Sequence, residues 1–146
     1  MKIYLANQES KFNQQLDVLI AKNVMPYDKS YLTEKISQIE IKTTKDFDQI
    51  NTDFFFNYHV FPENILSAKT QWDNEKRKMN VGDTIVQQVY LPPNRFLSQK
   101  LIFGVRISEI FTQKNKIGFS YETLEGHVEK GISTFTIEKL DSKIVF

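Results

Sequence analysis

The residues best suited to chemistry lie in one short stretch, where a single residue separates His127 from Glu129. In extended backbone, side chains two positions apart emerge on the same face, so we expect these two to lie close enough to share a proton or a metal ion. A neutral imidazole beside a carboxylate is suited to act as a general base near pH 7. Tyr121 adds a hydroxyl group that can orient a substrate. These three residues are the candidate catalytic group of a hydrolase-like or isomerase-like enzyme.

The same residues also fit a purely structural role. Polar side chains in loops commonly bond to nearby backbone, and His127 and Glu129 would then hold a turn together. A metal site is not predicted, because two ligands are fewer than zinc or iron sites normally need and the chain has no cysteine. His59, the only other histidine, would add a ligand only if the fold brought it near. No phosphate-binding glycine loop or nucleophile elbow is present, so no cofactor is predicted.

A β-hairpin is expected to position these residues. The pattern predicts one strand over residues 118–124, a tight polar connection, and a returning strand from Ile132. Gly126 and Gly131 bracket the connection, and glycine is most useful where the backbone φ angle is positive. We therefore expect positive φ at one or both of them.

The rest of the chain predicts further strands and a few helices. Period-two alternation predicts strands over 84–91, 101–111 and 143–146. It also predicts two inward rows, which are Leu101, Phe103, Val105 and Ile107 in the first and Phe135 and Ile137 in the second. Upstream, we expect a strand over 2–6, a helix over 10–24, a strand over 34–42, a helical turn ending at Ile50, a strand over 53–62 and a short helix within 62–73. Together these predict an α+β domain with a curved antiparallel sheet.

Composition narrows the class of protein. A chain of 146 residues is expected to form one domain over 1–146, with a core rich in its 12 phenylalanines. The net charge of +1 gives no reason to expect nucleic acid or an anionic membrane as partner. No run has transmembrane length and the start lacks the apolar core of a signal peptide, so we expect a cytoplasmic protein without membrane insertion.

The hairpin stretch is similar to a signature found in an uncharacterised family of bacterial and plant proteins. The signature runs Gly-Phe-x-Tyr-x-Thr-Leu-x-Gly-His-x-Glu-x-Gly, followed by Phe. In this chain it is formed by Gly118, Phe119, Tyr121, Thr123, Leu124, Gly126, His127, Glu129, Gly131 and Phe135. The resemblance covers residues 81–146. The chain departs from the family pattern with Glu122 in place of Gly, Val128 in place of Pro, and Ile132-Ser133 in place of acidic residues.

That domain-of-unknown-function family resembles the START-like, Bet v 1-like helix-grip (SRPBCC) superfamily, in which a curved sheet grips a long helix around an apolar cavity. The resemblance implies the same architecture here, although the long C-terminal helix is missing from the sequence. Either the helix over 10–24 takes its place or the cup is more open.

The function expected from these observations is the binding of a small apolar or amphipathic molecule in the concavity of the sheet. The residues expected to line that site are Phe54, Phe56, Tyr58, Phe119, Thr123 and Arg106. The first alternative is the acid–base enzyme described above. The second is an interaction module that dimerises through an exposed edge strand at 143–146, so the oligomeric state is expected to be a monomer or a weak homodimer.

Overall fold

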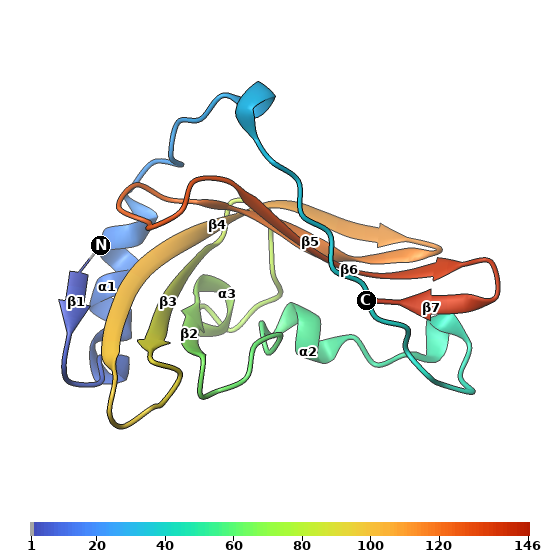
Figure 1. Ribbon diagram of the computed structural model, residues 1–146, viewed down its shortest axis with the longest axis horizontal. Helices are drawn as coiled ribbons and strands as arrows, with labels where there is room; N and C mark the ends of the chain where they lie inside the picture. Colours follow the sequence, from blue (N-terminus) through green and yellow to red (C-terminus); the bar gives the residue numbers. More distant parts are fainter. Residues whose placement is uncertain (1) are drawn as a thin grey trace.

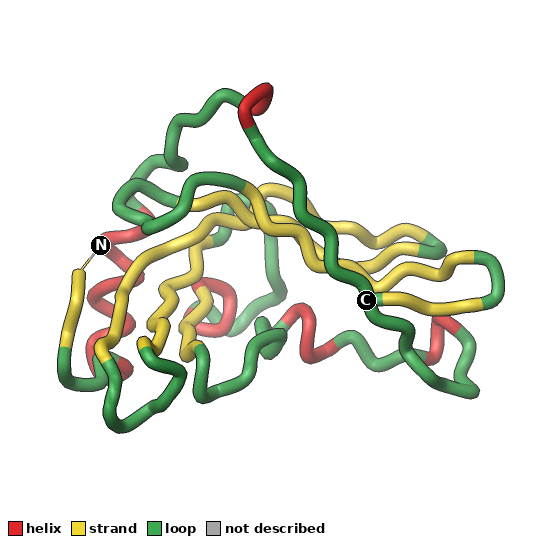
Figure 2. The backbone as a smooth tube through the Cα atoms, viewed as in Figure 1, coloured by secondary structure: helices red, strands yellow, loops and turns green. Residues whose placement is uncertain are grey.

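The computed structural model describes residues 2–146 and shows a strongly curled antiparallel sheet with short helices on both of its faces (Figures 1 and 2). The strands are β1 (Lys2–Tyr4), β2 (Leu66–Thr70), β3 (Thr84–Leu91), β4 (Gln99–Gln113), β5 (Lys116–Thr123), β6 (Ile132–Leu140) and β7 (Lys143–Val145). Their spatial order is β2-β3-β4-β5-β6-β7, and β1 pairs with the first part of β4. The α+β class and the curved antiparallel sheet are as predicted.

The helices are short. They are α1 (Phe12–Ile20), α2 (Asp53–Phe56) and α3 (Gln71–Asn74), with single 3₁₀ turns η1 (Glu9–Lys11), η2 (Lys29–Tyr31) and η3 (Phe47–Gln49). No helix among residues 2–146 is both long enough and apolar enough to cross a membrane.

One face of the sheet is covered by α1. Phe12, Leu16 and Leu19 are buried against strand residues of β3 and β4. Gly104 lets the helix approach, because a Cβ atom at this position would lie only 2.8 Å from a methyl carbon of Leu19. The predicted amphipathic helix is therefore confirmed, although it is shorter than the 10–24 range.

The opposite face, called here the aromatic face, carries the main core. Val105, Ile107, Phe119 and Ile137 of the sheet are all at most 1% exposed. In Figure 1, α2 and α3 lie beneath the arch that β4, β5 and β6 form on this side. The inward row predicted in β4 is buried along its whole length.

The segment from 53 to 70 differs from the prediction. Residues 53–56 form α2 rather than a strand, with the backbone N–H of Phe55 donating to the carbonyl of Thr52. The short helix expected within 62–73 is confined to α3, because residues 66–70 pair with β3 as strand β2. Consecutive phenylalanines match neither the period of a helix nor that of a strand, so the local pattern does not predict the structure of this segment. Pairing with a neighbouring strand decides it instead.

The strand expected over 34–42 is reduced to a short extended piece beside β7. The backbones of Ile39 and Phe146 exchange two hydrogen bonds of 2.9 Å, and Ile41 donates to Ile144. Figure 1 shows this segment passing beside the C-terminus. The edge at 143–146, considered above for dimerisation, is therefore occupied by the chain itself.

The hairpin has the predicted glycine geometry. Gly126 has φ of 88° and Gly131 has φ of 152°, so positive φ is confirmed in the connection between β5 and β6. Gly118 serves a different purpose: a Cβ atom there would lie 2.0 Å from the backbone oxygen of Phe135. Only glycine lets β5 and β6 approach this closely.

Candidate functional site

His127 and Glu129 lie in the connection between β5 and β6 and are bonded within that loop. Nδ1 of His127 accepts a hydrogen bond of 3.0 Å from the backbone N–H of Glu129. The imidazole also packs on Phe103, with 4.1 Å between ring centroids. Burial lowers the pKa of His127, and the nearby Glu129 opposes this effect. The imidazole is therefore neutral near pH 7, which is necessary for Nδ1 to accept a hydrogen bond.

Tyr121 lies in the aromatic core and not in the loop. Its ring is 7% exposed and lies 6.3 Å from the ring of Tyr58 and 5.8 Å from that of Phe135. Within residues 2–146, no hydrogen bond joins the side chains of Tyr121, His127 and Glu129. The structure places these three residues on one hairpin without linking them.

The residues expected to line a ligand site are distributed over both faces of the sheet. Phe119 is fully buried, Phe56 packs partly against the same core, and Phe54 is 40% exposed. Thr123 fastens the hairpin, since its hydroxyl accepts a 3.1 Å hydrogen bond from the backbone N–H of Gly131. Of the predicted residues, Tyr58 borders an open pocket.

Arg106 lies on the opposite face, where it holds the end of α1. Its guanidinium donates to the carbonyl oxygens of Leu19, Ile20 and Lys22 at 3.1, 3.1 and 2.8 Å. Cations at a helix C-terminus bind carbonyl groups that have no partner within the helix. Arg106 therefore stabilises the end of α1, on the side of the sheet opposite the aromatic face.

The pocket beside Tyr58 lies along β2, the terminal strand of the sheet order, and is called here the edge pocket. Its volume is about 230 Å³. It is lined by Glu9, Asn57, Tyr58, His59, Phe61, Glu63, Leu66, Ser67, Ala68, Thr70 and Arg95. Four of these residues belong to β2 itself. The others come from η1, from the connection that precedes β2 and from the connection that joins β3 to β4, and these segments meet at the lower end of the molecule in Figure 2.

Tyr58 forms the aromatic wall of the edge pocket with an unusual backbone. Its φ is 60°, a left-handed conformation that is uncommon for a bulky residue and strained. The hydroxyl accepts a hydrogen bond from Nε2 of Gln87, which is itself 2% exposed. Burial raises the pKa of Tyr58 well above its usual range. The phenol is thus neutral, and its oxygen is held at the pocket wall by the hydrogen bond from Gln87.

The other side of the edge pocket is polar. The hydroxyl groups of Ser67 and Tyr90 are 2.9 Å apart, and the Tyr90 hydroxyl also bonds to Nε2 of Gln88 at 3.0 Å. Glu9 extends this network towards solvent through a 3.0 Å ion pair with Arg95. An apolar wall facing a row of hydrogen-bonding groups suits a molecule that has both characters.

The polar side of the pocket was missed in the sequence. Gln87 and Gln88 do not line the pocket, but these two adjacent, almost fully buried amides of β3 are the clearest sequence signal that polar partners lie beside the strand. Buried amides require partners, which these find in Tyr58 and Tyr90. Nothing in the local pattern indicates that Glu9 and Arg95 meet.

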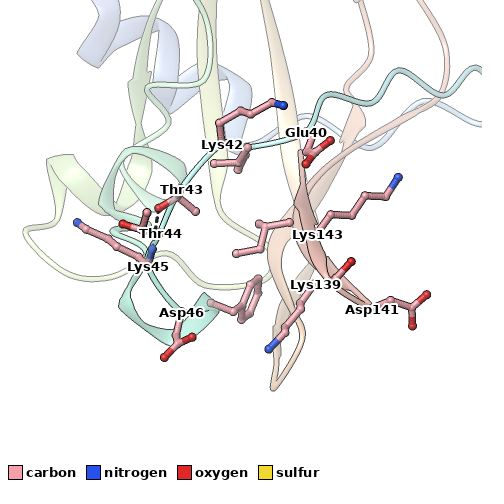
Figure 3. A pocket seen from close by; sticks show the side chains of 13 residues that line it. Glu40, Lys42, Thr43, Thr44, Lys45, Asp46, Lys139, Asp141 and Lys143 are labelled. Carbon is pink, nitrogen blue, oxygen red and sulfur yellow. Dashed lines mark hydrogen bonds between the residues drawn. The ribbon is translucent and has the colours of Figure 1, made fainter.

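A second, wider depression of about 850 Å³ lies between residues 40–47 and the turn from β6 to β7 (Figure 3). Its floor is apolar, while its rim carries four lysines and three carboxylates that are all exposed. Figure 3 shows that Lys42, Lys45, Lys139 and Lys143 do not converge on one point. A solvated rim of mixed charge does not define a site.

Fold and pocket together define an α+β protein with a curled antiparallel sheet and a small pocket at the sheet's edge. The family model described as Domain of unknown function (DUF1990) matches residues 42–146, and the chain belongs to that family. The match begins well upstream of residue 81, where the resemblance in sequence was expected to start, and it includes the whole segment from η3 to β7. No curated protein and no solved structure matches the chain.

Proposed function

We propose that the protein binds a small amphipathic molecule in the edge pocket. The observation that carries this proposal is the two-sided lining, with Tyr58, Phe61 and Leu66 facing Ser67, Glu9 and Arg95. The strained backbone of Tyr58 supports it, since strain of this kind is concentrated at functional sites. The family whose signature the hairpin carries is itself similar to helix-grip proteins, which enclose an apolar cavity, and this similarity agrees with a ligand-binding role.

The location differs from the concavity considered in the sequence. Beneath the arch, Phe55 and Phe119 are fully buried and fill the space with side chains. The accessible volume lies instead at the margin of this aromatic core, where Tyr58 belongs to both the core and the pocket wall. The proposed ligand therefore binds beside the core and not within it.

The size of the edge pocket limits the ligand. At about 230 Å³ it is smaller than the roughly 300–1,000 Å³ typical of sites for drug-sized molecules. A single fused ring pair or a short alkyl chain with one polar end fits this description. We expect generic probes to bind with micromolar dissociation constants, because few polar contacts are available to strengthen the complex.

A titration with 1-naphthol, a small aromatic alcohol, tests the proposal. The expected result is saturable binding that Ala68→Leu weakens at least about tenfold, because the added side chain enters the pocket. Ala21→Leu adds the same atoms at an exposed position away from the pocket and is the matched control. Absence of saturable binding, or equal affinity in both variants, would contradict the proposal.

Acid–base catalysis by His127 and Glu129, with Tyr121 as an orienting donor, is the second candidate function. The observation that favours it is a half-buried imidazole that burial keeps neutral by lowering its pKa, although its unprotonated Nδ1 must leave the backbone N–H of Glu129 before it accepts a proton. Hydrolysis of an activated ester such as 4-nitrophenyl acetate, compared between the native protein and His127→Asn, is the test. A general base contributes at least about 100-fold, so equal rates would exclude this role for that substrate.

A further inference from the structure

Lys100 carries a buried charge with no carboxylate partner. The side chain is 2% exposed, and its ammonium donates hydrogen bonds to the backbone oxygens of Leu5 at 3.0 Å and Ser98 at 2.7 Å. No ion pair within residues 2–146 includes Lys100. An ammonium group has three donors, and buried charges are ordinarily paired. Among residues 2–146, one donor and the positive charge of Lys100 are therefore left without a partner.

The side chain lines a pocket of about 510 Å³, called here the Lys100 pocket. Its walls are formed by Leu5, Ala6, Asn7, Arg95, Phe96 and Lys100. The lining thus contains two cations and no carboxylate. Glu9, which does not line this pocket, pairs with Arg95 from the side of the edge pocket and bonds only to Nη2 of the guanidinium. The other donors of Arg95 have no side-chain or backbone partner among residues 2–146 and can bind another group.

The apolar part of the lining is unusually exposed. Leu5 is 82% exposed and Phe96 is 87% exposed, and both line the pocket. Oγ of Ser98 is a buried polar atom without a hydrogen-bond partner, and it belongs to the residue whose carbonyl accepts a hydrogen bond from Lys100. Unsatisfied buried groups cost free energy and call for an explanation.

We infer that the Lys100 pocket binds the oxyanion end of a small amphipathic acid. The oxyanion is held by Lys100 at the base of the pocket and by Arg95 at its edge, and the alkyl or aryl part lies against Leu5 and Phe96. Glu9 offsets the charge of Arg95, so Lys100 leaves one uncompensated positive charge at the pocket. A monoanion such as a carboxylate neutralises that charge. This site is separate from the edge pocket, although Arg95 lines both.

Hexanoate, hexanol and inorganic phosphate are the probes that test this inference, each titrated into the full chain and followed by amide chemical shifts. Hexanoate is expected to bind saturably and to shift the amides of Ala6 and Phe96. Hexanol, which has the same chain without the charge, should bind at least about tenfold more weakly. Phosphate is an anion without an apolar part. It should also bind more weakly than hexanoate, because the pocket is proposed to contact both the charged end and the alkyl chain. Equal binding of hexanol or of phosphate would overturn the inference, as would the absence of saturable hexanoate binding.

Two variants locate the bound anion. Lys100→Gln should weaken hexanoate at least about tenfold, while Lys114→Gln, at an exposed lysine, should leave it unchanged. Because Lys100 also bonds two backbone carbonyls, its replacement can unfold the protein, and a second variant is needed. Ala6→Leu is that variant, since the larger side chain narrows the pocket from an exposed wall. Ala6→Leu should weaken hexanoate but not 1-naphthol, so failure here is distinguishable from failure of the edge pocket. Unchanged hexanoate affinity in a folded Lys100→Gln or in Ala6→Leu would contradict the assignment.

Discussion

Single residues in this protein carry out tasks that their types alone do not reveal. Tyr58 is the clearest case, because it is at once a core aromatic, a hydrogen-bond acceptor for Gln87 and a wall of the edge pocket. His127 shows the converse, since a residue with obvious chemical potential is occupied by a bond to the backbone of its own loop. At this scale, the partners of a residue decide its role.

Replacing Tyr58 with Phe should reduce the free energy of unfolding by roughly 1–2 kcal/mol, because the buried amide of Gln87 then loses its acceptor. Urea unfolding measures this change. Tyr31→Phe is the control, since Tyr31 is 85% exposed and should be neutral. Equal stability of the two variants would show that the hydroxyl of Tyr58 contributes nothing.

The protonation of His127 should make stability depend on pH. Its pKa in the folded protein is lowered from the ordinary value of 6.5, so the unfolded chain binds the proton more readily. The stability it contributes is present above about pH 6.5 and is lost as the pH falls through the lowered pKa. Unfolding measured between pH 7.5 and roughly pH 5 should therefore show a decline that His127→Asn reduces. His59→Asn, at an exposed position, should retain the decline, and an equal slope in native protein and His127→Asn would refute the effect.

At the scale of elements, the local sequence pattern predicts the hairpins but not the structure of residues 53–70. Residues 84–91 and 116–140 contain runs rich in β-branched and aromatic residues that are bounded by turn residues, so their strands were predictable. Residues 53–70 were not, because three adjacent phenylalanines suit a strand and a helix equally and the pairing of β2 with β3 is a tertiary choice. The role of Arg106 could not be predicted either, because the alternation of side chains along a strand does not show which face of the sheet a helix covers.

Arg106 should stabilise α1 without contributing to ligand binding. Arg106→Gln removes three hydrogen bonds to the end of the helix and should lower the free energy of unfolding by roughly 1–3 kcal/mol. Faster hydrogen exchange in residues 16–20 is the most direct readout. Affinity for 1-naphthol should stay the same, and a large loss of affinity in a folded variant would instead indicate that Arg106 contacts the ligand.

Gly118 should be the least replaceable glycine of the hairpin. In Gly118→Ala the added Cβ would clash with backbone atoms of β6, so the pairing of β5 with β6 must shift at a cost of about 3 kcal/mol. Gly82→Ala is the comparison, because Gly82 also has positive φ, at 92°, but has no atom within 4 Å of the added carbon. A thermal melt should rank Gly118→Ala well below Gly82→Ala, and the reverse order would contradict the close-approach argument.

At the scale of the whole molecule, the candidate site arises where distant segments meet. Glu9, Tyr58, Ser67 and Arg95 come from four parts of the chain and converge at one end of the sheet. Sequence pattern describes each segment but not their convergence, which explains why only Tyr58 among these was named in advance. Of the aromatic residues expected to line a ligand site, Phe56, Tyr58 and Phe119 pack together in the core, and the accessible space lies at the margin of that core.

Chemical-shift mapping with 1-naphthol is the most direct test of the claim that this margin is a binding site. We predict that the largest amide shifts occur at Tyr58, Phe61 and Ala68, that they saturate together with one micromolar dissociation constant, and that Ala68→Leu abolishes them. The loop at His127 should not respond to the probe. Shifts centred on His127, shifts spread evenly over the surface, or an Ala68→Leu variant that binds as well as Ala21→Leu would contradict the account.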